Sequence, residues 1–162
     1  MKVEQIYTGC LAQGAYYIES EGEAAVIDPL REVLKYTNLL LLDAYEATRL
    51  AVSEDLSTAA LVLQQAGPRI VAIKNGARGT LICTPDRTFH QPAVIVPEDQ
   101  IVETVGAGDT FDAAFVTAFL SGWSVERCAK FAAAAAASSL RGAGAVSSLA
   151  SREELERQLD ME

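Results

Sequence analysis

The chain has 162 residues, of which 50% are hydrophobic and 22% are charged. This length suits a single domain over residues 1–162 with a sizeable core, and the apolar content excludes an intrinsically disordered chain. The 13 basic and 22 acidic residues give a formal net charge of −9, which argues against nucleic acid and anionic membranes as partners.

The cysteines and the histidine restrict the possible metal and redox chemistry. Cys10, Cys83 and Cys128 are odd in number and far apart, which indicates reduced thiols rather than a disulfide framework or a metal-binding pair. Because His90 is the only histidine, a zinc site built from several histidines is excluded, as is a Ser-His or Cys-His catalytic system that does not use it. No secretory signal pattern opens the sequence and its apolar runs are too short to cross a bilayer, so we expect a cytoplasmic protein.

The first part of the chain is predicted to be β structure. Short runs of β-forming residues between residues 3 and 28 are separated by glycines, and Glu21-Gly22-Glu23 is typical of a hairpin turn. The stretch up to Thr37 is ambiguous. The apolar run Leu39–Leu42 that follows predicts a strand buried on both faces.

Helical and strand patterns alternate in the middle of the chain. The elements expected there are a helix over residues 57–66, strands at 70–73 and 80–83 joined by an Asn75-Gly76 hairpin turn, and a short strand at 94–96. Ser57 is the expected N-cap of the helix, and Gly67-Pro68 is its expected stop.

The C-terminal third is predicted to be helical. Three phenylalanines recur with helical spacing and form one aromatic face that we expect to pack in the core: Phe111, Phe115 and Phe119. Ser124 is the expected cap of an alanine-rich second helix, and Ser151-Arg152-Glu153-Glu154 predicts a capping box before a short terminal helix. Strands that alternate with helices indicate an α/β layered fold.

The segment 102–112 has the strongest chemical pattern. Gly106 and Gly108 lie between an extended stretch and a helix start, where backbone N–H groups and the positive end of the helix can hold a phosphate. Asp109, at the helix entrance, could accept a proton from an attacking substrate hydroxyl. The alternative is that Asp109 caps the helix and Asp112 interacts with the helix dipole, and both roles remain open at this point.

The run from Glu103 to Phe115 closely resembles the C-terminal signature of the ribokinase-like (PfkB) carbohydrate kinase family, and the resemblance extends from about residue 39 to 159. It implies a three-layer, Rossmann-like α/β domain and an ATP- and Mg²⁺-dependent phosphotransferase that acts on a sugar or nucleoside hydroxyl. By this likeness Asp109 is the catalytic base. The residues that the likeness places around the phosphates are Gly106, Ala107 and Gly108, whose amides form an anion hole, and Thr104, which binds nucleotide.

Asp43-Ala44-Tyr45-Glu46 falls where members of that family carry Asn-x-x-Glu, a motif tied to metal and phosphate handling. The resemblance therefore places Asp43 and Glu46 beside the nucleotide, with Glu46 reaching Mg²⁺ through phosphate or water. This chain departs from the pattern because Asp43 replaces the asparagine and adds negative charge beside the phosphates. Without the resemblance, Glu46 is an ordinary charged residue at a helix start.

Two further loops resemble nucleotide-binding segments of the family. The turn that contains Lys74, Gly76 and Gly79 is similar to a glycine turn on the nucleotide side, although a hairpin that needs positive φ angles explains it equally well. Residues 141–148 look like the loop that borders the adenine.

The resemblance of this loop also implies the remaining residues of the predicted site. They are Gly144 and Ala145 for nucleotide, and carbonyl or hydroxyl oxygens of Glu103, Val105 and Ser148 for a monovalent cation such as K⁺.

The N-terminal segment departs from the family. Members are much longer, and the sugar-binding half and β lid that they carry are not recognisable here. Residues 1–33 instead resemble the opening β segment of metallo-β-lactamase-fold hydrolases, whose zinc-binding motif the chain never reaches. We therefore expect a truncated kinase domain, residues 39–159, joined near residues 28–38 to an N-terminal β-hairpin segment.

The sequence predicts an ATP-dependent kinase that phosphorylates a hydroxyl of a sugar-like small molecule, with an activity impaired by truncation. The first alternative is a noncatalytic nucleotide-binding or assembly module, and a minor alternative is a metallo-β-lactamase-fold hydrolase. Sheet edges or helix faces left uncovered would favour a homo-oligomer.

Overall fold

The computed structural model describes residues 2–7, 14–20, 23–27, 31–144 and 149–160. The chain divides into two compact units, and each is described by itself below. Unit 1 comprises residues 1–75 and 80–90, and unit 2 comprises residues 76–79 and 91–162.

The N-terminal strands of unit 1 form an antiparallel meander. β1 (Lys2–Tyr7) pairs with β2 (Gly14–Ser20), and β2 pairs with β3 (Glu23–Ile27), which confirms the predicted hairpin, although its turn at residues 21–22 lies outside the described residues. After the 3₁₀ helix η1 (Arg31–Tyr36), β4 (Leu39–Asp43) runs parallel to β3. The N-terminal strands therefore join the sheet of unit 1 through β3.

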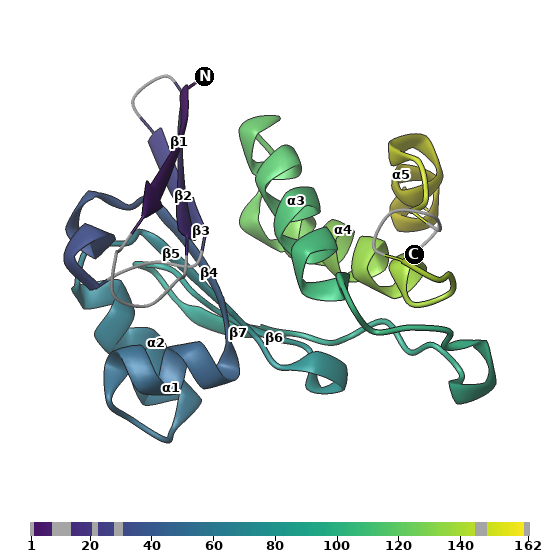
Figure 1. The fold of residues 1–162 in the computed structure, drawn as a ribbon, viewed down its shortest axis with the longest axis horizontal. Coiled ribbons are helices and arrows are strands. Elements are labelled where there is room, and N and C mark those ends of the chain that lie inside the picture. Colours follow the sequence, from purple (N-terminus) through teal and green to yellow (C-terminus); the bar gives the residue numbers. More distant parts are fainter. Residues whose placement is uncertain (1, 8–13, 21–22, 28–30, 145–148, 161–162) are drawn as a thin grey trace. The chain divides into compact units, whose positions relative to one another are not determined.

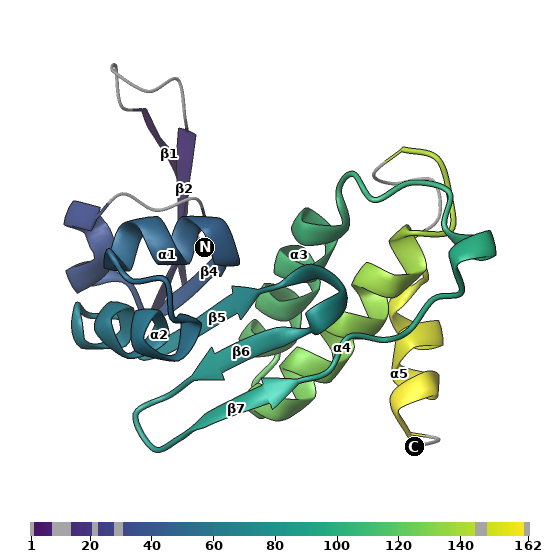
Figure 2. The same ribbon diagram turned by 90° about the horizontal axis from the view of Figure 1, so that it is seen from below.

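A seven-stranded sheet follows the order of the chain, β1-β2-β3-β4-β5-β6-β7. β5 (Ile70–Lys74) is parallel to β4, β6 (Thr80–Cys83) is antiparallel to β5, and β7 (Thr88–Gln91) follows β6 (Figure 2). Leu39 to Leu42 of β4 are 0 to 1% exposed, as predicted for a strand covered on both faces.

Two helices lie side by side against β4 and β5, namely α1 (Ala44–Ala51) and α2 (Leu56–Gln65) (Figure 1). They bury Ala47, Ala60 and Leu63 against Leu40 and Leu42, which makes the core of unit 1. Small alanines on the inner faces let both helices approach the sheet closely.

The N-cap of α2 is Asp55, so the prediction of Ser57 was wrong. The Asp55 carboxylate accepts hydrogen bonds from the amide and the hydroxyl of Thr58, both at 2.7 Å. These bonds lower the pKa of Asp55, because they stabilise its ionised form. A carboxylate at this position satisfies an amide of the first turn and adds a favourable interaction with the helix dipole, which a serine two residues later cannot provide.

Unit 2 is mainly helical. Its helices are η2 (Gly76–Arg78), η3 (Glu98–Gln100), α3 (Ala107–Leu120), α4 (Val125–Ser139) and α5 (Arg152–Asp160). The strand predicted at residues 94–96 is wrong, because this stretch is irregular and the strand of the region is β7 at 88–91. Pro92 and Pro97 bracket the stretch; proline lacks an amide proton, and it restricts the residue before it.

Helices α3 and α4 pack on each other, and α5 packs on α4. Phe111 and Phe115 are 4% and 0% exposed with ring centroids 6.0 Å apart, and Phe119 is half-buried, so the predicted aromatic face lies in the core. Ser124 caps α4 as predicted, since its hydroxyl accepts a hydrogen bond from the Arg127 amide.

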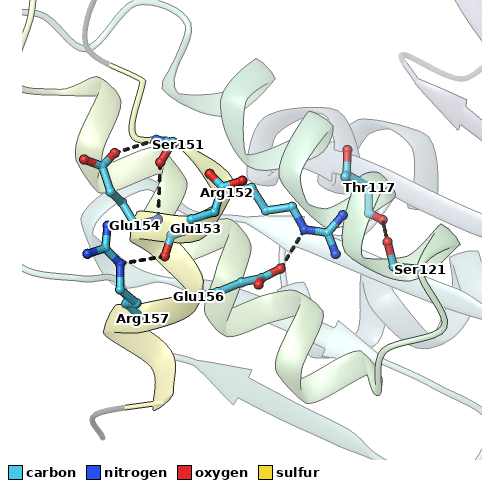
Figure 3. A network of polar contacts seen from close by, with 8 residues as sticks. All are labelled: Thr117, Ser121, Ser151, Arg152, Glu153, Glu154, Glu156 and Arg157. Atoms are coloured by element: carbon cyan, nitrogen blue, oxygen red, sulfur yellow. Dashed lines mark hydrogen bonds and ion pairs between the residues drawn. The ribbon is translucent and has the colours of Figure 1, made fainter.

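The predicted capping box of α5 is present (Figure 3). The Ser151 amide donates to Glu154 at 2.8 Å and the Glu154 amide donates to the Ser151 hydroxyl at 3.3 Å. Hydrogen bonds from the backbone amide and then the side chain of Ser151 lower the pKa of the Glu154 carboxyl, because they favour its ionised form. One turn on, Arg152 pairs with Glu156 at 2.6 Å, and its guanidinium also lies 5.5 Å from the centre of the Trp123 ring.

In the part of the chain that the structure describes, every helix is too short or too polar to cross a membrane.

Candidate functional site

The glycine turn before α3 has the backbone geometry that its sequence requires. Gly106 is the N-cap of α3 with φ of +83°, a left-handed conformation that side chains disfavour. Its carbonyl accepts hydrogen bonds from the amide of Thr110 at 2.8 Å and from the hydroxyl of Thr110 at 2.9 Å. Thr110 therefore fixes the turn at the start of the helix.

The amides of this turn differ in how they are engaged. Within the described residues, neither Gly106 nor Gly108 donates its amide proton to an acceptor. Ala107 donates to the Thr104 carbonyl over 3.4 Å, at the long end of hydrogen-bond distances. Two amides at the positive end of α3 thus have no acceptor among the described residues, and such amides can bind an anion.

Asp109 is the third residue of α3 and is exposed. Because the helix begins at Ala107 after a glycine N-cap, Asp109 is not the cap that one reading of the sequence allowed. Its carboxylate makes no hydrogen bond to any of the described residues. Asp112 is the sixth residue of α3, so it lies beyond the first turn of the helix, and it is only 4% exposed.

At the other candidate motif, Asp43 and Glu46 form a capping box at the start of α1. The Glu46 amide donates to Oδ1 of Asp43 and the Asp43 amide donates to Oε2 of Glu46, each at 2.8 Å. The spacing Asp-x-x-Glu is typical of a capping box and could have predicted these bonds. The two carboxylates that the resemblance assigns to nucleotide and metal therefore also hold the helix start.

Lys74 joins this pair at the same edge of the sheet. β4 and β5 are parallel, and Asp43, the last residue of β4, is the register partner of Lys74, the last residue of β5. In open α/β sheets, ligands bind at the carboxyl ends of the parallel strands. The topology of unit 1 thus brings Asp43, Glu46 and Lys74 to the edge where such ligands bind.

The turn after Lys74 has the positive φ angles expected from its glycines. Gly76 and Gly79 have φ of +55° and +84°, and the Gly79 amide donates to the Gly76 carbonyl at 3.0 Å. This confirms the predicted hairpin between β5 and β6. The nucleotide-binding role of the two glycines stays a prediction.

In unit 2, a contact between distant residues joins the segment before the glycine turn to the loop after α4. The Gly144 amide donates to Oε2 of Glu103 at 2.7 Å, although 41 positions separate the two residues. The Val102 amide donates to the Leu140 carbonyl at 2.8 Å, next to this contact. The predicted role of Glu103 used only its carbonyl, because nothing in the sequence indicates that its side chain reaches residue 144.

The predicted site residues therefore fall into separate local clusters. Asp43, Glu46 and Lys74 gather in unit 1, whereas Thr104 and the glycine turn, with Glu103 and Gly144, gather in unit 2. Thr104 and Val105 are exposed. The last two predicted residues, Ala145 and Ser148, lie outside the described residues. No three Asp, Glu, His or Cys side chains among those described come close enough together to hold a metal ion.

Comparison with known proteins gives a family match over most of the chain. The family described as pfkB family carbohydrate kinase matches residues 10–152. This match begins within the N-terminal segment, whose similarity to metallo-β-lactamase-fold hydrolases stays a prediction. A ribokinase from Arabidopsis thaliana is 39% identical over 100 residues, which are 61% of this chain and 26% of that protein.

Solved structures agree with this match. A ribokinase from Thermotoga maritima has a TM-score of 0.73 and 30% identity, covering 82% of this chain and 46% of that one. Arabidopsis thaliana ribokinase complexed with ribose and ATP has a TM-score of 0.72 and 32% identity, covering 80% of this chain and 43% of that one. These likenesses confirm the predicted α/β fold class, and in each of these matches the chain spans less than half the length of the other protein.

Proposed function

The chain belongs to the pfkB family of carbohydrate kinases, and we propose that it transfers the terminal phosphoryl group of ATP to a hydroxyl of a sugar or related small molecule. The observation that carries this proposal is the start of α3. There, amides of Gly106 and Gly108 that have no acceptor among the described residues lie within three residues of the exposed carboxylate of Asp109.

Each part of this turn has a task in the proposed reaction. The Asp109 carboxylate accepts the proton of the acceptor hydroxyl while that oxygen attacks the terminal phosphorus and the bond to ADP breaks. The amides of Gly106 and Gly108, with that of Ala107 once it leaves Thr104, donate hydrogen bonds to the negative oxygens of the transferred group. Because the helix start fixes the amides of Gly106 and Gly108, these two donors need little reorganisation during the reaction.

The remaining residues are proposed to hold the nucleotide. Backbone at Gly76 and Gly79 approaches the phosphates with Lys74 as a positive group, and Thr104, Gly144 and Ala145 contact the nucleotide. Asp43 is proposed to lie near the phosphates of the nucleotide, and its carboxylate also caps the start of α1.

We propose Mg²⁺ as the divalent ion. The chain would bind it together with the phosphates of the nucleotide. The described residues supply no cage of three ligands, but Mg²⁺ in kinases binds one or two carboxylates together with substrate phosphates. Glu46 would hold it through phosphate or water. When bound, the ion neutralises negative charge on the phosphates. Oxygens of Glu103, Val105 and Ser148 are proposed for K⁺.

An ADP-release assay tests this function on the full chain with ATP, Mg²⁺ and ribose, followed by a panel of sugars and nucleosides. We expect Asp109→Asn to lower kcat about 100- to 10,000-fold, the range typical of a lost general base. Asp99→Asn is the matched control because Asp99 is an exposed acid of unit 2 outside the proposed site, and its rate should equal that of the wild type.

Two results would overturn the proposal. Equal rates for the wild type and Asp109→Asn would remove Asp109 as the base. An increase of the melting temperature by ATP, without ADP release on any acceptor, would instead identify a noncatalytic nucleotide-binding module.

A further inference from the structure

The Glu103 side chain connects two segments that lie far apart in the sequence. Its Oε2 atom accepts the Gly144 amide proton at 2.7 Å, a short hydrogen bond to a charged acceptor. Glu103 is half-buried and lies three residues before Gly106. The loop after α4 is therefore fixed directly to the segment that leads into the glycine turn.

Backbone contacts of neighbouring residues hold the base of this loop. Val102 and Glu103 donate their amide protons to the Leu140 carbonyl, at 2.8 and 3.4 Å, where α4 ends. From Leu140 the chain continues for four residues to Gly144, which has φ of +80° and is exposed. Among the described residues, the carboxylate of Glu103 is the hydrogen-bond partner that the structure gives to the Gly144 amide.

We propose that Glu103 is a positioning residue for nucleotide. Its carboxylate holds residues 141–144 at a fixed place beside the glycine turn before α3. The inference rests on the function proposed above, because it supposes that ATP binds at this turn. Loss of the carboxylate leaves the Gly144 amide free to turn to water. The loop then samples more conformations, and ATP binding has to order it again at a cost in affinity.

The chain offers a graded set of variants. Glu103→Ala removes the acceptor, and Glu103→Gln keeps an oxygen that can accept the same hydrogen bond without the charge. Glu98→Gln is the matched control: Glu98 lies on the same connecting segment, is exposed, and makes no side-chain hydrogen bond to the described residues, so the variant loses the same charge but no contact.

Amide hydrogen exchange measures the contact without ATP. In Glu103→Ala we expect the Gly144 amide to lose its protection while the Val102 amide keeps its own, and in Glu98→Gln neither should change. Equal protection of Gly144 in the wild type and in Glu103→Ala would overturn the proposed contact.

ATP titration and kinetics then measure the consequence. We expect Glu103→Ala to weaken ATP binding about tenfold, which corresponds to one lost charge-assisted hydrogen bond. Glu103→Gln should lie between Glu103→Ala and the wild type, and Glu98→Gln should match the wild type.

The outcomes separate this inference from the function that it rests on. If the wild type binds ATP and Glu103→Ala binds it equally well, the positioning role of Glu103 is wrong and the kinase proposal stands. A loss of kcat without a change in ATP affinity would also overturn the positioning role. If the wild type itself binds no ATP, the proposed function fails.

Discussion

Asp43 and Lys74 are register partners across the parallel strands β4 and β5, and each is the last residue of its strand. The parallel register therefore brings an acidic and a basic residue to the same edge of the sheet in unit 1. Asp43 has a second task there, because its Oδ1 atom accepts the Glu46 amide proton and caps α1. The effects of its substitution should separate these two tasks.

Asparagine at position 43 should preserve the cap and remove the charge. We expect Asp43→Asn to change the free energy of unfolding by less than about 0.5 kcal/mol, whereas Asp43→Ala should lower it by about 1 kcal/mol because the N-cap acceptor is lost. Urea denaturation measures both values. Equal losses in the two variants would show that charge, rather than capping, is what Asp43 contributes.

Gly67 lies where no side chain fits. Its φ is +148°, and a Cβ atom there would lie 2.3 Å from the Leu34 carbonyl oxygen and 2.5 Å from the Cα atom of Lys35. We expect Gly67→Ala to lower the free energy of unfolding by about 3 kcal/mol, because the backbone of η1 would have to move.

Gly122 provides the matched control for this substitution. Its φ is +76°, but a Cβ atom would meet nothing within 4 Å. Gly122→Ala should therefore cost only the conformational strain, about 1 kcal/mol. A loss in Gly67→Ala no larger than that in Gly122→Ala would contradict the clash with η1.

Val52 is the reverse case, a side chain where glycine is preferred. It ends α1 in the left-handed conformation with φ of 54°, although it is β-branched, and it is 78% exposed. We expect Val52→Gly to raise the free energy of unfolding by about 1 kcal/mol, since the strain disappears and little packing is lost. Thermal unfolding measures the change. Destabilisation by this variant would show that the exposed side chain contributes to packing.

Cys128 should make stability depend on pH in the alkaline range. Burial raises the pKa of its thiol from 9.0 to about 11, with the nearby Glu126 charge as a smaller cause, because the charged thiolate is poorly solvated in the core. The unfolded chain ionises this thiol at lower pH than the folded chain does. The contribution of Cys128 is therefore fully present below about pH 9 and is lost as the pH rises to 11.

Unfolding in urea at several pH values, with Cys128→Ala for comparison, checks this dependence. The wild type should lose more free energy of unfolding between pH 9 and 11 than the variant loses. Parallel curves would show that Cys128 ionises equally in both states.

The sequence predicted those parts of the fold that depend on local pattern. Leu39–Leu42 could be identified as a covered strand because four adjacent leucines fit no half-exposed element, and Ser124 and Ser151 because capping needs only neighbouring residues. The predicted strand at 94–96 failed since its apolar residues were weighed without the effect of the flanking prolines on strand pairing.

In the candidate site, too, local features could be predicted from the sequence, whereas contacts between distant segments could not. The helix after Gly106 could be predicted from the helical spacing of its phenylalanines, and the turn before it from its two glycines. The pairing of Asp43 with Lys74 depends on strand register, and the bond from Gly144 to Glu103 spans 41 positions. Neither contact follows from local sequence, because both arise only when distant segments pack.

The seven strands of the sheet succeed one another in space exactly as they do along the chain. Every strand is thus laid down beside the one that precedes it, and no pairing has to wait for a remote segment to arrive. Closing short loops costs less entropy than closing long ones, and topologies with nearby partners fold faster. The sheet can therefore form through pairings between strands that follow one another in the chain.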